Sequence, residues 1–274
     1  MTTDPLPGVC DDLAAETAEL LAVFAPLTRE QWLLDTPADD WTIRDQIAHL
    51  AFFDETGRLA ATDAEAFAVS TAELMSGTDP MAGPVARGRS MDPFDVLAWF
   101  ETARADMIAA FRGLTGSTRL PWYGPAMSAT SFATARLMET WAHGQDVLDA
   151  LGLTRTPTAR LKHIAHIGVR ARAFSYVTNG RAVPDGEVSV QLHAPDGSVW
   201  SWNAPPEGIL AENAIVGDAL EFCLVVTQRR HVDDTSLEVT GPLARDWIGI
   251  AQAFAGGPGT GREPGQCGPA DPVR

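Results

Sequence analysis

Hydrophobic residues follow two different periods along this chain, and the change falls near residue 180. Before it, apolar residues recur at the spacing of an amphipathic helix, and after it they alternate as in a strand. Long helices are predicted at residues 8–26, 42–61, 92–114 and about 128–151, with a fifth at 157–180. Four long helices with loops between them predict an antiparallel bundle. The alternating segment GEVSVQLHAPDGSVWSWNA predicts a β-hairpin. We therefore expect an α+β fold, a four-helix bundle followed by a small α/β domain.

The predicted domain boundaries follow from the same change of period. Residues 1–180 form the helical domain, residues 181–258 the small α/β domain, and residues 259–274 a tail rich in Gly and Pro. A tail of that composition is expected to be disordered or to lie over the surface. Residues 76–91 are also rich in Gly and Pro and predict a loop. A loop of this length often accompanies a functional site.

The charge of the chain is negative and unevenly distributed. The formal charge is 20 − 36 = −16; residues 1–152 carry 9 − 23 = −14 and residues 153–274 carry 11 − 13 = −2. Because an acidic half repels a phosphate backbone, the charge argues against nucleic acid as the main ligand.

Localisation is predicted from what the sequence lacks. No stretch approaches the roughly 20 apolar residues of a membrane span, and the acidic start has no signal-peptide pattern. We therefore expect a cytoplasmic protein that does not bind membranes. Cys10, Cys223 and Cys267 are far apart, which argues against a disulfide framework or a thiolate zinc site.

The stretch LMETWAHGQDVLDALG, residues 137–152, places three ionisable groups on one helix face. Glu139 and His143 are one turn apart, and Asp146 follows three residues later. Such a face is more often simply exposed to solvent than part of a site. Ala135 and Ala142 share this face, however, which is atypical of a fully solvated helix surface. Both interpretations stay open at this point.

His49 lies beside the apolar stripe of the helix predicted at residues 42–61. Facing helices of a bundle can bring such side chains together around a metal. His49, Glu139 and His143 would supply two nitrogens and one carboxylate oxygen, the ligand set of a catalytic zinc with an open position. The same set also suits nickel, iron or manganese. Asp146 then either orients a ligand histidine or is solvated, and Arg136 is expected to form a local salt bridge.

The two motifs together resemble a known family. WTIRDQIAHL at residues 41–50 and ARLMETWAHGQDVLDALG at residues 135–152 look like those of the DinB-like, mycothiol-dependent maleylpyruvate isomerase family. In that family a tryptophan precedes a helix with the first histidine ligand, and E-x-x-x-H on the fourth helix supplies two more. The resemblance thus implies His49, Glu139 and His143 as metal ligands. It covers the four helices well and the C-terminal, sterol-carrier-like α/β domain more loosely.

The resemblance implies a metal-dependent enzyme. A divalent metal, expected to be zinc, would bind the thiol of mycothiol, a co-substrate that adds to an electrophilic small molecule in an isomerase or S-transferase reaction. Arg229 and Arg230 follow the segment GDALEFCLVV, near the place where the family has an arginine at the site. They either bind a carboxylate or sugar hydroxyl, or only end a surface helix. Trp122 and Tyr123 either wall the pocket for the thiol or pack in the core.

Two other functions are compatible with the same residues. One is a metal-binding protein without thiol-transfer activity, and the other is a metal-dependent hydrolase or cyclase that uses bound water. The expected partners are a small-molecule substrate and a thiol, and the expected assembly is a monomer or a homodimer.

Overall fold

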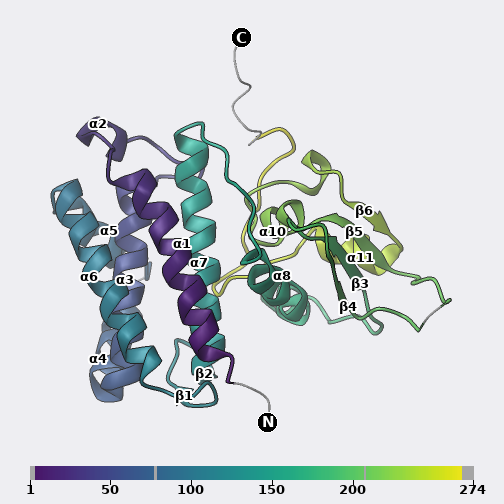
Figure 1. The fold of residues 1–274 in the computed structure, drawn as a ribbon, viewed down its shortest axis with the longest axis horizontal. Helices are drawn as coiled ribbons and strands as arrows, with labels where there is room; N and C mark the ends of the chain where they lie inside the picture. The colour runs from purple at the N-terminus through teal and green to yellow at the C-terminus, as the bar shows by residue number, and fades with distance from the viewer. Residues whose placement is uncertain (1–3, 77–78, 207, 267–274) are drawn as a thin grey trace. The chain divides into compact units, whose positions relative to one another are not determined.

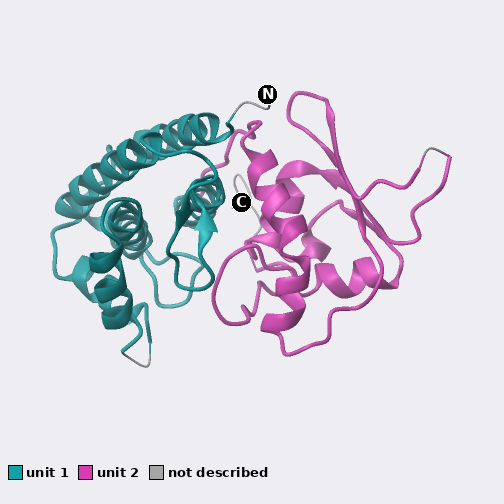
Figure 2. Cartoon of the chain, turned by 90° about the horizontal axis from the view of Figure 1, so that it is seen from below, with its two compact units in different colours: residues 1–151 teal, residues 152–274 magenta. Residues whose placement is uncertain are grey.

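The computed structural model describes residues 4–76, 79–206 and 208–266, and the chain divides into two compact units (Figure 2). Met1–Leu151 form a helical unit, and Gly152–Arg274 form a unit of helices and a sheet. The α+β class predicted from periodicity is confirmed. The elements of the helical unit are α1 (Leu6–Phe24), α2 (Arg29–Trp32), α3 (Ile43–Thr62), α4 (Ala64–Leu74), α5 (Ala82–Arg89), α6 (Pro93–Arg112), β1 (Arg119–Leu120), β2 (Met127–Ser128) and α7 (Ala129–Ala150).

Four long helices, α1, α3, α6 and α7, form the bundle, but they do not all alternate in direction (Figure 1). Along α3 and α6 the paired residues advance together, since Asp54 binds Arg104 and Gly57 faces Met107. These two helices are therefore parallel, and the expectation of a fully antiparallel bundle is wrong for this pair. A long crossover connection, as in other bundles, makes the parallel arrangement possible.

The crossover contains a helix where the sequence predicts only a loop. Within residues 76–91, α5 packs against α3, and Gly88 lies so close that an added Cβ would be 2.4 Å from the Cβ of Ala48. The composition misled the prediction, because Pro84 lies in the first turn, where proline is tolerated, and Gly88 serves close packing. Residues 77 and 78 lie outside the described part of the chain.

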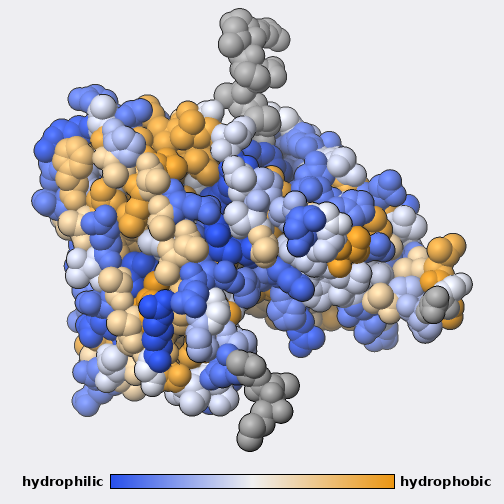
Figure 3. All heavy atoms as spheres, viewed as in Figure 1, coloured by the Kyte–Doolittle hydropathy of each residue, from blue (hydrophilic) through white to orange (hydrophobic). Residues whose placement is uncertain are grey.

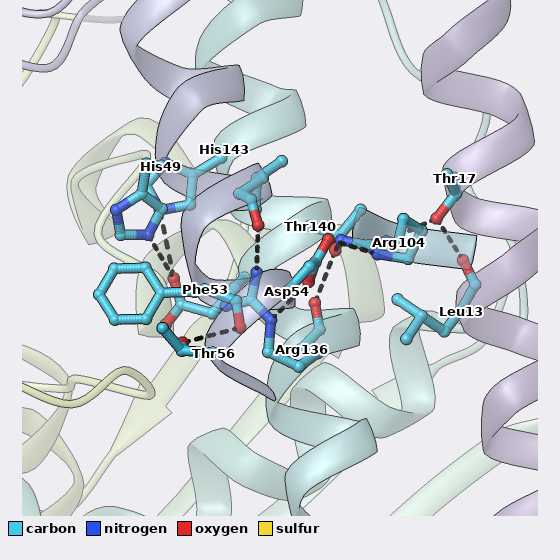
Figure 4. Close-up of polar contacts among 12 residues, drawn as sticks. Leu13, Thr17, His49, Phe53, Asp54, Thr56, Arg104, Arg136, Thr140 and His143 are labelled. Carbon is cyan, nitrogen blue, oxygen red and sulfur yellow. Dashed lines mark hydrogen bonds and ion pairs between the residues drawn. The ribbon is translucent and has the colours of Figure 1, made fainter. Parts of the chain in front are cut away.

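A buried ion cluster joins the four helices at mid-height (Figure 4). The Asp54 carboxylate on α3 accepts hydrogen bonds from Arg104 Nε on α6 at 2.7 Å and from Arg136 Nε on α7 at 3.0 Å. Arg104 also donates to Thr17 Oγ1 on α1 and to Thr140 Oγ1 on α7. Asp54 is fully buried, so these partners compensate a charge that would otherwise cost several kcal/mol. Arg136 forms the expected salt bridge, but with a residue 82 positions away rather than a local one.

The second unit is built on a four-stranded sheet of order β4-β3-β5-β6. Strands β3 and β4 pair antiparallel and confirm the predicted hairpin, whereas β3 and β5 are parallel. The elements of this unit are α8 (Leu161–Arg170), α9 (Arg172–Thr178), β3 (Ser189–His193), β4 (Val199–Trp202), β5 (Ala214–Asp218), α10 (Ala219–Val226), the 3₁₀ helix η1 (Val232–Asp234), β6 (Glu238–Thr240) and α11 (Pro242–Ile248). Asp218 caps α10 by accepting from the amides of Leu220 and Glu221, at the point where β5 ends and the helix begins.

The boundary between the units differs from the one at residue 180, because α8 and α9 belong to the second unit. Helix α8 packs on α10: an added Cβ on Gly168 would be 2.7 Å from Val226 Cγ2, and Cys223 Sγ donates to Leu161 O at 3.4 Å. Helical periodicity shows that α8 has an apolar face but not which element covers it.

The first residues of the tail are tied to the second unit. Gly259 N donates to Gln252 Oε1 at 3.0 Å, and Gly265 N donates to the Asp234 carboxylate at 2.9 Å. Residues 259–266 therefore lie over the surface, one of the two arrangements expected for them. Cys267 and the residues after it fall outside the described range.

Hydrophilic and hydrophobic side chains are interspersed on the surface (Figure 3). The exposed large hydrophobic residues include Leu33 at 50% and Leu210 at 95%, which lie in different units. Scattered residues of this kind are normal on a folded protein. None of the helices within the described ranges has both the length and the apolar character that a membrane span needs.

We predict that Asp54→Ala lowers the free energy of unfolding by about 3–5 kcal/mol, because it leaves two buried arginines without their carboxylate. Urea unfolding of the full chain, followed by far-ultraviolet circular dichroism, measures the change. Asp106→Ala, which removes an exposed acid from α6, is the matched control and should cost less than about 0.5 kcal/mol. Equal stability of the two variants would contradict a central role for the ion cluster.

Candidate metal site

Three potential metal ligands, His49, Glu139 and His143, converge between α3 and α7, one turn from the ion cluster. Figure 4 labels the two histidines beside that cluster. His143 Nε2 lies 3.1 Å from Glu139 Oε2, and His49 Nε2 lies 3.7 Å from the same oxygen. One donor atom from each residue lies within 4.8 Å of the other two. In residues 4–76, 79–206 and 208–266, no other three His, Cys, Asp or Glu residues come together in this way. The antiparallel packing of α3 on α7 brings the two motifs together.

The three side chains are mostly enclosed, yet each keeps an exposed fraction. Exposure is 11% for His49, 20% for Glu139 and 12% for His143. Glu139 and His143 therefore do not lie on a solvent-exposed helix face, which was one of the two interpretations of residues 137–152. The three side chains are therefore enclosed by the fold without being sealed from solvent.

The electrostatics of the site suit a cation. Burial and then the neighbouring His143 lower the pKa of His49 to about 3, so this imidazole is neutral at physiological pH. Burial raises the pKa of Glu139, but hydrogen bonds with His143 and His49 outweigh it and hold that pKa well below its usual range. The result is an ionised carboxylate beside a neutral imidazole. Metal ions bind both groups in these protonation states.

A buried glutamine that sequence reasoning missed contacts the second histidine. Gln46 Oε1 on α3 lies 2.5 Å from His143 Nδ1, and Gln46 Nε2 donates to Thr36 Oγ1 at 2.8 Å. The available signal was its position three residues before His49, which places it on the same side of α3. Asp146, proposed for this role or for solvation, is only 1% exposed, so a solvated position is wrong.

Aromatic rings surround the histidines. Trp41 stacks on His143 at 5.9 Å between ring centroids with an interplanar angle of 18°, and it also contacts His49 at 5.3 Å. Phe53 also contacts His49, at 4.7 Å between ring centroids. Tyr123 packs on Phe53 at 5.5 Å and donates to Thr56 Oγ1, so it lies one ring away from His49. These rings restrict water and hold the imidazoles in place.

The remaining predicted residues have other surroundings. Trp122 packs edge-on against Phe132 at 4.6 Å, in keeping with the core-packing alternative, and its binding to a thiol stays a prediction. Arg229 and Arg230 lie in the second unit just after α10, where Arg229 Nη1 donates to Thr227 O and Arg230 Nη1 to Arg229 O. Their proposed contact with substrate also stays a prediction.

The donor set fits a divalent metal. Two imidazole nitrogens and one ionised carboxylate oxygen form the set that catalytic zinc sites use, with a position left for another ligand. Gln46 contacts the His143 imidazole at its other nitrogen, as hydrogen-bonding partners of ligand histidines do at metal sites. His49, Glu139 and His143 would be the ligands.

Comparison with known proteins gives related chains and a related fold. Residues 13–148 match the model of the mycothiol maleylpyruvate isomerase N-terminal domain. Uncharacterized proteins of Mycobacterium tuberculosis, from strains H37Rv and CDC 1551, are each 40% identical over 260 residues, 94% of this chain and 99% of their own length. The crystal structure of a mycothiol-dependent maleylpyruvate isomerase has a TM-score of 0.59 at 17% identity, covering 88% of this chain and 99% of that one. A mutant of such an isomerase, in which a histidine is replaced by alanine, has a TM-score of 0.57 over the same shares of the two chains.

The lowered pKa of His49 predicts an acid-dependent loss of stability in the metal-free protein. Below pH 6.5 the unfolded chain takes up a proton at His49 that the folded chain, with a pKa of about 3, does not. Stability from this group is therefore present above pH 6.5 and decreases as the pH falls. The slope is at most about 1.4 kcal/mol per pH unit.

Urea unfolding from neutral pH down to about pH 5 measures this slope, in a range where Glu139 contributes little. His49→Asn should have a shallower slope than the wild type, whereas His193→Asn, which changes an exposed histidine of β3, should keep the wild-type slope. Identical slopes in all three proteins would show that His49 is not held neutral in the folded state.

Proposed function

The chain belongs to the mycothiol maleylpyruvate isomerase family, and from this membership and its ligand cluster we propose a metal-dependent, thiol-activating enzyme. The proposed co-substrate is mycothiol, and the reaction is addition of its sulfur to an electrophilic small molecule. The observation that carries the proposal is the convergence of His49, Glu139 and His143 on α3 and α7, within the segment that matches the family.

The chemistry requires a thiolate at neutral pH. A bound divalent cation supplies this by lowering the pKa of a coordinated thiol. The residues of the chain provide the setting: Glu139 contributes one negative charge, and neutral His49 adds none. Trp41 and Phe53 limit water around the imidazoles, which protects a thiolate from hydration.

Two outcomes are possible for the sulfur after it adds to the electrophile. In an isomerase the carbon–sulfur bond forms at a double bond, the carbon–carbon bond rotates, and the sulfur leaves again. In an S-transferase the carbon–sulfur bond persists in the product. We propose that Arg229 and Arg230 bind a carboxylate or hydroxyl of the substrate, a role for which guanidinium groups are suited.

We predict that His143→Ala loses the metal without unfolding the protein, because the apolar faces of the helices and the Asp54 cluster supply most of the packing. Elemental analysis of the purified protein should find about one divalent ion per chain in the wild type and little in the variant. The thermal midpoint of the metal-free variant should stay close to that of the metal-free wild type. Loss of the fold would instead identify a structural metal.

Activity is tested with mycothiol and an electrophilic small molecule such as maleylpyruvate. His143→Ala should reduce the rate by more than the roughly 10–100-fold typical of outer-shell changes. His193→Ala, on the exposed side of β3, should leave the rate unchanged. A wild-type protein that binds metal tightly but never consumes the thiol would support the metal-binding alternative and contradict the enzyme.

A further inference from the structure

Gln46 is a fully buried amide with both of its ends engaged. It lies on α3, one turn before His49, with an exposure of 0%. Its Oε1 atom lies 2.5 Å from His143 Nδ1 on α7, and its Nε2 atom lies 2.8 Å from Thr36 Oγ1. Because a rotated or mobile amide would lose both bonds in a buried place, the contacts hold the side chain in one position.

The direction of each hydrogen bond follows from the far end of this chain of contacts. The carbonyl of Trp41 can only accept, so the Thr36 hydroxyl donates to it at 2.8 Å. The Thr36 oxygen then accepts from the Gln46 NH₂ group, which turns the Gln46 carbonyl toward His143. Since that carbonyl also only accepts, His143 Nδ1 must be the protonated nitrogen.

This assignment leaves the other nitrogen of His143, Nε2, facing Glu139 Oε2 at 3.1 Å. Because Nδ1 keeps its proton for the Gln46 carbonyl, Nε2 is the nitrogen that can exchange its own proton for a metal ion.

We propose that Gln46 is a positioning residue that fixes the tautomer of His143, so that Nε2 is always the nitrogen available to a metal. Thr36 and the Trp41 carbonyl act through Gln46 by fixing the orientation of its amide. The binding of a metal at Nε2 rests on the proposed function. The tautomer does not, because it is a property of the metal-free chain.

The first arm of the test reads the tautomer directly. Nitrogen NMR of metal-free protein with labelled histidine distinguishes the two ring nitrogens, at a pH where the imidazoles are neutral. The wild type should show His143 protonated at Nδ1, and Gln46→Leu should show a mixture or a shift to Nε2. Gln46→Glu, which keeps an acceptor at Nδ1, should restore the wild-type tautomer. Retention of the Nδ1 proton in Gln46→Leu would overturn the proposal.

The matched control is Gln145→Leu. Gln145 is also a buried glutamine, 5% exposed, but its amide donates to Asp149 on the same helix instead of contacting a histidine. The Gln145→Leu substitution removes the same chemical group from α7 and should leave the His143 signals unchanged. If Gln46→Leu does not fold, Thr36→Val breaks the same chain of contacts at its outer end and should weaken the tautomer preference.

The second arm titrates zinc alone into each metal-free protein. Gln46→Leu should bind zinc about 10–100-fold more weakly than the wild type, and Gln145→Leu should match the wild type. Equal zinc affinity of Gln46→Leu and the wild type would overturn the positioning role. A wild type that binds no zinc would contradict the proposed function, and the tautomer measurement would still decide the role of Gln46.

Discussion

The buried carboxylate of Asp54 fixes how the helical unit packs. Arg104 on α6 and Arg136 on α7 both bind it, and Arg104 continues to Thr17 on α1, so one charge joins all four long helices. A buried ion left without its partners costs several kcal/mol, so few helix registers other than this one are acceptable. The register has a direct consequence for the site. His49 lies five residues before Asp54 on α3, and Glu139 lies three after Arg136 on α7, so the pairing of Asp54 with Arg136 brings the ligands together.

Two polar clusters thus lie on the same helices, and they differ in how far their side chains are exposed. The Asp54 cluster is closed, since Asp54, Arg104 and Arg136 are at most 2% exposed and bind one another. The ligand cluster keeps partial exposure and directs nitrogen and oxygen atoms at a common point. Arg136 connects them, because it also donates to the carbonyl of Leu50, the neighbour of His49. A structural ion network therefore supports a site that is open to a ligand.

The sequence alone predicted the residue types of the candidate site but not the contacts that hold them. His49, Glu139 and His143 were found because their chemistry and the i, i+4 spacing are visible along one helix. Gln46 was missed because its bond to His143 joins positions 97 residues apart. The α+β class followed from periodicity, whereas the parallel pair α3 and α6 did not, because it depends on the crossover through α5. Gly and Pro within that segment predict a loop, and the close packing of Gly88 on Ala48 becomes visible only in the folded chain.

The local charge of the ligand cluster is less negative than that of the unit around it. Residues 1–152 carry −14, yet Glu139 is the single carboxylate among the three ligands, and two arginines compensate Asp54 in the ion cluster. Gln46 occupies a place where metal sites often have a carboxylate, and as an amide it orients His143 without adding negative charge. A divalent cation held by one carboxylate and two neutral imidazoles would retain a net positive charge, which favours an anionic sulfur over a neutral thiol. Glutamine at position 46 thus serves orientation and charge together, because an acidic residue there would orient His143 equally well but weaken the preference for a thiolate.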